Sequence, residues 1–385
     1  MRIGILGAAR TAIGTFGGAL AGVPPIELAR TVSAAAMERA GVEPERIGAS
    51  VFGHVINTEP RDIYLSRAAA MEAGVPDTVP AMNVNRLCGS GAEAVISAAR
   101  AVAMGDCVTA LAGGAECMSR SPYAVPGARW GVKMGDAKAQ DMMLGALNCP
   151  FGTGHMGVTA ENVAAEHGVS RADQDAFALE SQRRARRAID EGRFAEQIAP
   201  VEIASRRSTF SFETDEHPKE TSAEALAGLR PAFQKDGTVT AGNASGINDG
   251  AAAIVLAVEG VGTPIGYVTG YAHAGVRPEV MGIGPVPAVR ALLERTGLSA
   301  SDFDVVESNE AFAAQAIAVS RELGLDEARV NPNGGAIALG HPVGATGAIL
   351  VVKALHELRR TGGTRALVTM CIGGGQGIAL SLEAA

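Results

Sequence analysis

Short apolar runs and longer helix-compatible stretches alternate along most of this 385-residue chain. In the first third, strand-like runs at 50–55 and 108–113 are separated by helical stretches at 25–40 and 91–104. Strands that alternate with helices are typical of α/β proteins, in which a helix connects one strand to the next parallel strand. The sequence therefore predicts an α/β fold with largely parallel sheets.

The second part of the chain repeats this order of elements. Its predicted strands and helices fall at 265–270, 287–296, 304–307, 312–323, 347–360 and 365–370. The chain is too long for one minimal core, and 47% hydrophobic residues with 49 glycines suit close packing of helices on sheets. We therefore predict two duplicated α/β halves, one from residues 1–118 with about 232–262, the other from residues 263–385.

Between these halves, residues 119–231 follow a different pattern. Prolines and glycines between positions 122 and 135 mark a loop, 160–191 reads as charged helices, and 210–221 is polar and rich in turn formers. A segment of this length is unusual for a structureless connection. It is predicted to be an inserted loop domain that serves as a lid or as a binding and assembly unit, with a plain surface excursion as the alternative.

Cys88, His341 and Cys371 each lie in a short glycine-rich segment, although they are far apart in the chain. A thiol is nucleophilic only as the thiolate, so Cys88 needs a base such as His341 or the positive end of a helix. The small residues at 89–100 are compatible with a helix, which places Cys88 at a strand-to-helix elbow. Free backbone N–H groups at such an elbow stabilise an anion and can form an oxyanion hole.

Acyl transfer to carbon needs a second acid/base, which removes a proton next to a thioester, and Cys371 is the candidate. A structural alternative stays open for each of the three residues, because free cysteines are often buried and glycine-rich turns also serve packing. The remaining cysteines are expected to be structural, namely Cys107, Cys117 and Cys149. The remaining histidines are expected to be ordinary polar residues, namely His54, His167, His217, His273 and His356.

The three glycine-rich segments, in this order, resemble the signature blocks of the thiolase family, the acetyl-CoA acetyltransferases and 3-ketoacyl-CoA thiolases. Further stretches that resemble the family pattern are 10–14, 155–157, 159–162, 240–246 and 309–313. The resemblance runs from about residue 3 to the C-terminus. It implies the thiolase fold, in which two duplicated α/β halves form a layered αβαβα core with an inserted loop domain.

The resemblance also suggests a subfamily. His155, Met156 and residues 131–136 resemble the bacterial short-chain, biosynthetic type. Residues 59–62 and 128–131 further resemble the broad-range β-ketothiolases that feed polyhydroxyalkanoate synthesis. The implied reaction is the reversible condensation of acetyl-CoA with acetyl-CoA or another acyl-CoA to a 3-ketoacyl-CoA and coenzyme A, with ping-pong kinetics.

A role is implied for each residue that matches the family's catalytic positions. Cys88 matches the nucleophile that carries the acyl group, His341 its activating base, and Cys371 the acid/base that moves the α-proton. Asn309 matches the residue that forms one oxyanion hole through a water, together with His341. The backbone N–H groups of Cys88 and Gly373 match the second oxyanion hole.

Other positions match the substrate site of the family, and coenzyme A and acetyl-CoA are implied as substrates with no permanently bound cofactor. The implied substrate-binding residues are His155, Met156, Lys219, Ala244, Ser245, Ala311 and Phe312. Lys219 stands where the family often has arginine. Lysine can pair with a phosphate of the coenzyme, but it lacks the planar fork of arginine.

Composition restricts the partners. A net charge of −8 argues against nucleic acid, and no apolar run approaches the ~18 residues that would predict a membrane span. The five cysteines have no paired spacing, so we expect reduced thiols, no metal site and, without a recognisable targeting signal, a cytoplasmic protein. The resemblance implies a homotetramer, a dimer of dimers joined through residues 119–141.

Rival functions differ in the residues that they require. A degradative 3-ketoacyl-CoA thiolase of β-oxidation would carry the same residues, whereas a β-ketoacyl synthase has no use for Cys371. A non-catalytic carrier of acyl-CoA or lipid would not need Cys88, His341 and Cys371 together. A nicotinamide dehydrogenase is excluded, because no G-x-G-x-x-G follows the first strand with an acidic residue ~20 positions later.

Overall fold

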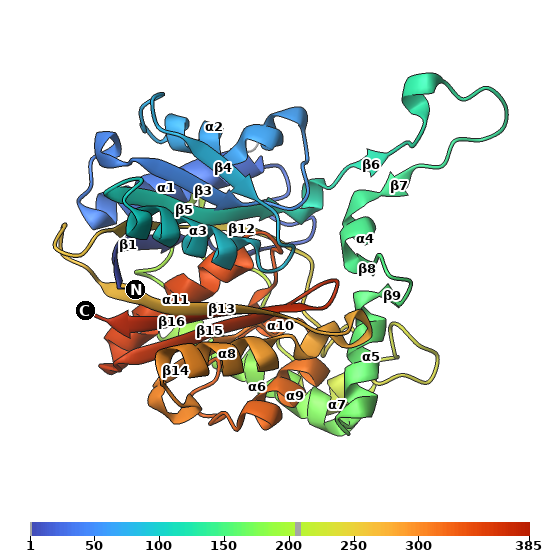
Figure 1. Cartoon of the computed structure of the whole chain (residues 1–385). Helices are drawn as coiled ribbons and strands as arrows, with labels where there is room; N and C mark the ends of the chain where they lie inside the picture. Colours follow the sequence, from blue (N-terminus) through green and yellow to red (C-terminus); the bar gives the residue numbers. More distant parts are fainter. Residues whose placement is uncertain (1, 205–208) are drawn as a thin grey trace.

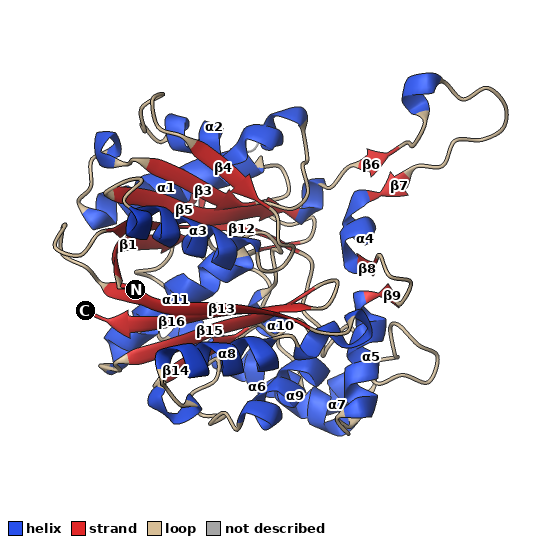
Figure 2. Ribbon diagram, in the orientation of Figure 1, coloured by secondary structure: helices blue, strands red, loops and turns tan. Residues whose placement is uncertain are grey.

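The computed structural model describes residues 2–204 and 209–385, which form two α/β halves stacked on one another (Figures 1 and 2). The strands of the N-terminal half are β1 (Ile3–Arg10), β2 (Gly14–Thr15), β3 (Ala49–Gly53), β4 (Ala81–Val84), β5 (Thr109–Cys117) and β12 (Asn248–Ala257). Those of the C-terminal half are β13 (Gly266–Gly275), β14 (Val305–Ser308), β15 (Arg365–Ile372) and β16 (Gln376–Ala384). Within the described residues these strands form one sheet of ten strands, because β1 pairs with β13 at the junction.

The pairing pattern of the strands repeats in the two halves. Starting from β1, the neighbours are β12 and β5, both in antiparallel pairs, and then β3 in a parallel pair. Starting from β13, the neighbours are β16 and β15 in antiparallel pairs, and then β14 in a parallel pair. The two series meet where β1 and β13 pair antiparallel. This repeat supports the predicted duplication.

The prediction of largely parallel sheets is wrong. Among the described strands of the large sheet, only the pairs β3–β4, β3–β5 and β14–β15 are parallel. Strand β15 passes into β16 through a short turn after Ile372, and strands joined so tightly must be antiparallel. Strands β12 and β16, which were not predicted from the sequence, account for most of the antiparallel pairs.

Helices cover the outer faces and fill the space between the halves (Figure 1). Helix α1 (Pro25–Ala40) packs on β1 and β12, and α8 (Pro285–Thr296) packs on β13 and β16. Between the halves, α3 (Ser90–Met104) contacts α11 (Thr346–Thr361), which also contacts strands of both halves. Smaller helices are α2 (Leu65–Glu72), α9 (Ala313–Leu323) and α10 (Ala336–Leu339). The core is thus a layered αβαβα arrangement.

Glycines bring the first turns of α3 and α11 into backbone contact. A Cβ atom on Gly91 would lie 2.7 Å from the backbone N of Ala348, and one on Gly347 would lie 2.3 Å from the backbone N of Ala92. Only glycine permits backbones to approach this closely. Because Cys88 and His341 lie just before these two turns, the contact brings the nucleophile candidate of one half to the base candidate of the other.

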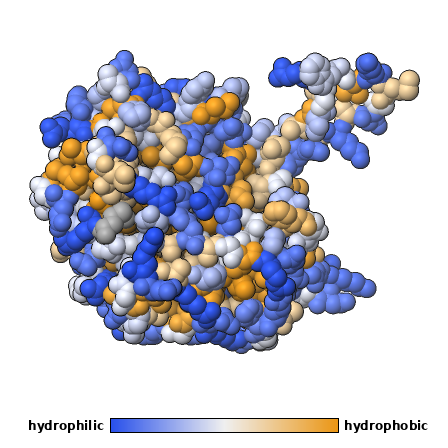
Figure 3. Space-filling view, viewed as in Figure 1, coloured by the Kyte–Doolittle hydropathy of each residue, from blue (hydrophilic) through white to orange (hydrophobic). Residues whose placement is uncertain are grey.

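The segment between β5 and β12 contains small elements and two long helices. They are β6 (Tyr123–Ala124), β7 (Gln140–Asp141), α4 (Met142–Leu147), β8 (Asn148–Cys149), β9 (Gly154–His155), α5 (Met156–Glu166), α6 (Arg171–Asp190), β10 (Val201–Ala204), β11 (Thr209–Phe212) and α7 (Ala223–Ala227). Beyond β6 and β7 the chain makes an excursion that projects from the body (Figures 1 and 3). Its side chains include Trp130 and Met134, which are 82% and 96% exposed.

No helix in the described ranges is both long enough and apolar enough to cross a membrane.

Candidate active site

A cavity of about 370 Å³ opens between the two halves, and the residues predicted for the site gather around it. The predicted residues that line it are Cys88, His155, Met156, Lys219, Ala244, Ser245, Ala311, Phe312, His341, Cys371 and Gly373. They come from both halves and from the inserted segment. The fold thus brings together side chains that are hundreds of positions apart in the chain.

Cys88 lies at the turn between β4 and α3. Leu87 precedes it with a φ of 46°, a left-handed conformation that is uncommon for a residue with a side chain. Ser90 holds this turn, since its hydroxyl donates to the Leu87 carbonyl at 2.6 Å and accepts from the Arg86 N–H at 2.8 Å. The left-handed conformation of Leu87 and the hydrogen bonds of Ser90 thus direct the Cys88 thiol into the cavity, just before the start of α3.

Opposing influences act on the Cys88 thiol. Burial raises the pKa of Cys88, while hydrogen bonds to its sulfur from the backbone N–H groups of Gly373 and of Cys88 itself act to lower it. The same two N–H groups are those expected for an oxyanion hole. Because burial is the larger influence, the resting thiol keeps its proton and needs a base nearby.

His341, the candidate base, lines the same cavity as Cys88, and its tautomer follows from its hydrogen bonds. Its Nδ1 lies 2.6 Å from Thr346 Oγ1, and the Thr346 hydroxyl donates to the Pro342 carbonyl at 2.8 Å. The hydroxyl has one proton, so Nδ1 must donate its own hydrogen to Thr346 Oγ1. Nε2 therefore carries the lone pair that can take a proton. Burial lowers the pKa of His341 to about 4, which keeps the ring neutral at pH 7.

Asn309 is the predicted site residue that does not line the cavity. It follows β14, is fully buried, and its Nδ2 lies 3.4 Å from His341 Nε2. Asn309 therefore contacts His341 directly, and His341 in turn lines the cavity. The water predicted to connect Asn309 to the substrate stays a prediction.

Cys371 is the last residue but one of β15 and is almost completely buried. Burial raises the pKa of Cys371, and the nearby Cys88 raises it further. A thiol in this setting is a weak acid, and its thiolate, once formed, is a strong base. Gly373 follows it in the turn to β16.

The predicted substrate residues line the cavity, whose wall is largely apolar. The ring of His155 stacks on Phe233 with ring centroids 4.7 Å apart. The Ser245 N–H donates to the Ala311 carbonyl at 3.0 Å, which joins the 240–246 segment to the 309–313 segment. Met156 begins α5 and lies in one apolar cluster with Cys371.

Several residues of the site were missed in the sequence. His217, predicted to be an ordinary polar histidine, lines the cavity, and burial lowers its pKa to about 4. Phe233 and Met281 also line the cavity. Thr346 carried a signal that could have been used, because it lies five positions after His341 at the start of a helix.

The donor set gives no support to a resident metal. Within residues 2–204 and 209–385 no three His, Cys, Asp or Glu side chains gather as metal ligands would. The cavity instead combines a largely apolar wall with imidazole side chains, two thiols and backbone N–H groups. That combination suits a thioester that arrives, reacts and leaves.

Comparison with known proteins agrees with this geometry. Two family models match, the thiolase N-terminal domain over residues 3–260 and the thiolase C-terminal domain over residues 262–384. The β-ketothiolase BktB of Cupriavidus necator is 56% identical, with 98% of each chain covered. An acetyl-CoA acetyltransferase of Chromobacterium violaceum is 49% identical, with 100% of each chain covered. The crystal structure of human mitochondrial 3-ketoacyl-CoA thiolase in complex with CoA superposes with a TM-score of 0.97 at 41% identity, covering 100% of this chain and 98% of that one.

Proposed function

This chain belongs to the thiolase family of acyltransferases, and from that premise we propose that it condenses acetyl-CoA with acetyl-CoA or another acyl-CoA, reversibly, through an acyl group on Cys88. The observation that carries the proposal is the convergence of Cys88, His341 and Cys371 on one cavity. The relatives named β-ketothiolase and acetyl-CoA acetyltransferase support the biosynthetic type. The resemblance of residues 59–62 and 128–131 to the broad-range β-ketothiolases supports a product that feeds polyhydroxyalkanoate synthesis.

In the first half-reaction the acyl group moves to the enzyme. His341 Nε2 takes the proton of Cys88, and the thiolate attacks the thioester carbonyl. The N–H groups of Cys88 and Gly373 stabilise the oxyanion. The bond to coenzyme A breaks, and the leaving thiolate takes the proton of Cys371. Acyl-Cys88, a protonated His341 and a Cys371 thiolate remain.

In the second half-reaction carbon attacks the acyl group. The Cys371 thiolate removes an α-proton from acetyl-CoA, and the enolate oxygen is held by protonated His341 and by Asn309 through a water. The carbanion attacks the acyl carbon on Cys88, and the bond from that carbon to Cys88 breaks. His341 returns its proton to Cys88, and Cys371 has regained its own. The product is a 3-ketoacyl-CoA.

The hydroxyl of Thr346 is expected to matter for the first step. Thr346→Val removes the acceptor of the His341 Nδ1 hydrogen, so the imidazole can carry its proton on Nε2 instead. In that tautomer Nε2 cannot take the proton of Cys88. We expect acylation by acetyl-CoA to slow by about 10- to 100-fold, the equivalent of about 1.5–3 kcal/mol for one hydrogen bond to a charged group. Rapid quench with intact-mass detection measures the rate. Thr346→Ser restores the acceptor and is expected to recover most of it, and equal rates in the valine and serine variants would contradict this role.

The nucleotide end of coenzyme A is proposed to lie over Lys219. A hollow of about 770 Å³ shares Lys219 with the reaction cavity and contains Arg183, Arg186 and Arg187 of α6. The Lys219 N–H is held by Gln182 Oε1 at 2.9 Å. Three carboxylates, Asp190, Glu191 and Glu220, also line this hollow. Its four cations suit the phosphates of the coenzyme, and the arginines supply the planar fork that Lys219 lacks.

We further propose a homotetramer in the cytoplasm. The exposed Trp130 and Met134 on the excursion beyond β6 and β7 support a role of residues 119–141 in assembly, because exposed apolar side chains of this kind mark contacts between proteins. The cytoplasmic location is supported by the cysteines, all five of which are free thiols in the described chain.

Mass spectrometry after brief exposure to acetyl-CoA tests the proposed function. We expect one acetyl group on the peptide that contains Cys88, and its removal by added coenzyme A. A chase with 3-ketoacyl-CoA esters of graded chain length then separates an acetoacetyl-specific enzyme from a broad-range one. Tight binding of acyl-CoA without any modification would instead support the non-catalytic carrier and overturn the proposal.

A further inference from the structure

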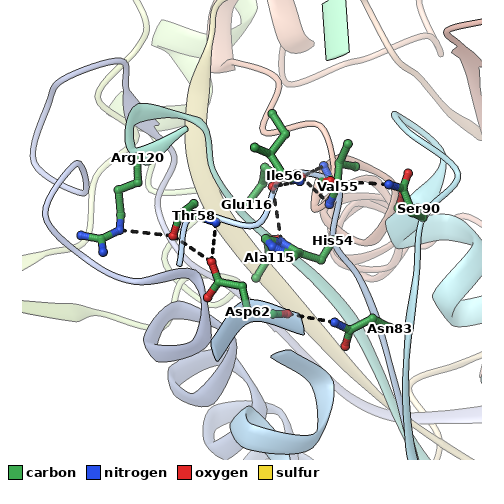
Figure 4. A network of polar contacts seen from close by, with 12 residues as sticks. His54, Val55, Ile56, Thr58, Asp62, Asn83, Ser90, Ala115, Glu116 and Arg120 are labelled. Atoms are coloured by element: carbon green, nitrogen blue, oxygen red, sulfur yellow. Dashed lines mark hydrogen bonds and ion pairs between the residues drawn. The ribbon is translucent and has the colours of Figure 1, made fainter. Parts of the chain in front are cut away.

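A buried carboxylate beside the active site takes no part in the steps above. Glu116 lies near the end of β5, and its side chain has no exposed surface. It accepts hydrogen bonds from the backbone N–H groups of Val55 at 3.1 Å, Ile56 at 3.1 Å and Gly344 at 2.9 Å. Figure 4 shows Glu116 beside the backbone of Val55 and Ile56, with His54 next to it.

This one side chain joins the two halves of the molecule. Val55 follows β3 in the N-terminal half, whereas Gly344 belongs to the loop that carries His341 in the C-terminal half, and both donate to the same oxygen, Oε2. The contact is close, because a Cβ atom on Gly344 would lie 2.4 Å from Glu116 Oε2. Glu116 therefore holds this loop at a point between His341 and Thr346. The hydrogen bond between these two residues determines which nitrogen of His341 is basic.

The neighbours of Glu116 match an ionised carboxylate. His54 Nδ1 lies 2.9 Å from the Ala115 carbonyl, which can only accept, so Nδ1 carries a hydrogen. The same Nδ1 lies 3.3 Å from Glu116 Oε1. Every polar neighbour described here is thus a donor, and none accepts the proton of a carboxylic acid. Burial raises the pKa of Glu116, and His54 with the three N–H groups acts against that rise.

We propose that Glu116 is a positioning residue for the acyl transfer inferred above: it fixes the His341 loop against Val55 and Ile56 after β3, and keeps a negative charge next to Val55, which lines the cavity together with Cys88. This charge disfavours the Cys88 thiolate. The thiol therefore keeps its proton until substrate is in place and His341 removes it. The expected effect of Glu116 on turnover rests on the proposed function, whereas its expected effect on the reactivity of Cys88 does not.

The charge of Glu116 is the side-chain charge that acts on the pKa of Cys88, raising it in addition to burial. The other titratable groups that line the cavity with Cys88 are Cys371, His341, His155, His217 and Lys219. A change in the pH dependence of Cys88 reactivity on replacing Glu116 therefore reports the charge of this residue.

Glu116→Gln in the full-length protein, followed by alkylation of Cys88 with iodoacetamide across pH and by steady-state kinetics, tests the inference. We expect the alkylation profile to move to lower pH and kcat to fall by about 10- to 100-fold, with KM for acetyl-CoA changed by less than about threefold. Glu116→Asp keeps the charge but shortens the reach. It is expected to lose kcat while its alkylation profile stays nearer to that of the parent protein.

Asp62→Asn is the matched control. Asp62 is also a fully buried carboxylate of the same region (Figure 4), and it accepts from the backbone N–H groups of Thr58 and Glu59 without contacting the His341 loop. It is expected to leave the alkylation profile and kcat unchanged. Equal effects of Asp62→Asn and Glu116→Gln, or an unmoved profile in Glu116→Gln, would overturn the inference.

Peptide mapping separates this inference from the proposed function. Alkylation is scored on Cys88 in folded protein, as judged by circular dichroism, and needs no turnover. If the parent protein never acquires an acetyl group, the proposed function fails, while the shift of the alkylation profile still tests the charge of Glu116. Should Glu116→Gln not fold, the aspartate variant still decides, because unchanged kcat there would overturn the positioning role.

Discussion

Replacing Cys88 by serine is expected to abolish turnover, with a loss on the order of 10⁴-fold or more. A serine hydroxyl is far less acidic than a thiol, and the neutral His341 beside it has a pKa lowered to about 4 by burial, so it is a weak base. No enzyme-bound acyl group forms without the thiolate. Steady-state release of coenzyme A and the intact mass after exposure to acetyl-CoA both measure this loss.

Cys107→Ser is the control for this prediction. Cys107 is a half-buried free thiol that does not line the cavity. Its replacement is expected to leave turnover and acetylation unchanged. Acetylation of the Cys88→Ser protein at wild-type rate, on any residue, would show that the acyl group is carried elsewhere.

Replacing Cys371 by alanine is expected to separate the two half-reactions. The variant keeps Cys88 and His341, so it should still become acylated, although coenzyme A loses its proton donor. Exchange of the α-protons of acetyl-CoA with solvent deuterium is expected to fall by about 10²- to 10⁴-fold, the usual contribution of a general acid/base. Proton NMR of the acetyl group in deuterium oxide measures the exchange.

Cys149→Ala provides the comparison, because Cys149 is buried in the same apolar cluster as Cys371. It tests whether loss of a buried thiol in this region disturbs the cavity by repacking alone. Rapid α-proton exchange by Cys371→Ala, at the level of Cys149→Ala, would discard the role assigned to Cys371.

Local elements could be predicted well from the sequence, whereas strand direction could not. The helix predicted at 25–40 has the bounds of α1, because Pro25 and Gly41 mark its ends. Strand β12 was missed, since the small residues at 250–253 leave only Ile254 and Val255 as a β-branched signal. Its buried position between β1 and β5 is decided by tertiary contacts that lie outside any local window.

The same division holds for the site. Cys88, His341 and Cys371 could be found because each combines a reactive side chain with neighbouring glycines. Glu116 could not be found, because its partners, Val55 and Gly344, come from two distant loops. Nothing in the residues around Glu116 indicates that both loops converge on it.

The place of β1 has a consequence for how the chain folds during synthesis. This strand lies between β12, which begins at Asn248, and β13, which begins at Gly266, so neither neighbour exists when β1 leaves the ribosome. At about 5–20 residues per second, a strand made first waits on the order of ten seconds or more for its partners. Contacts this distant in sequence also fold slowly. The apolar strand β1 is thus made well before both of its partners, and during this interval its unpaired edges expose the nascent chain to aggregation.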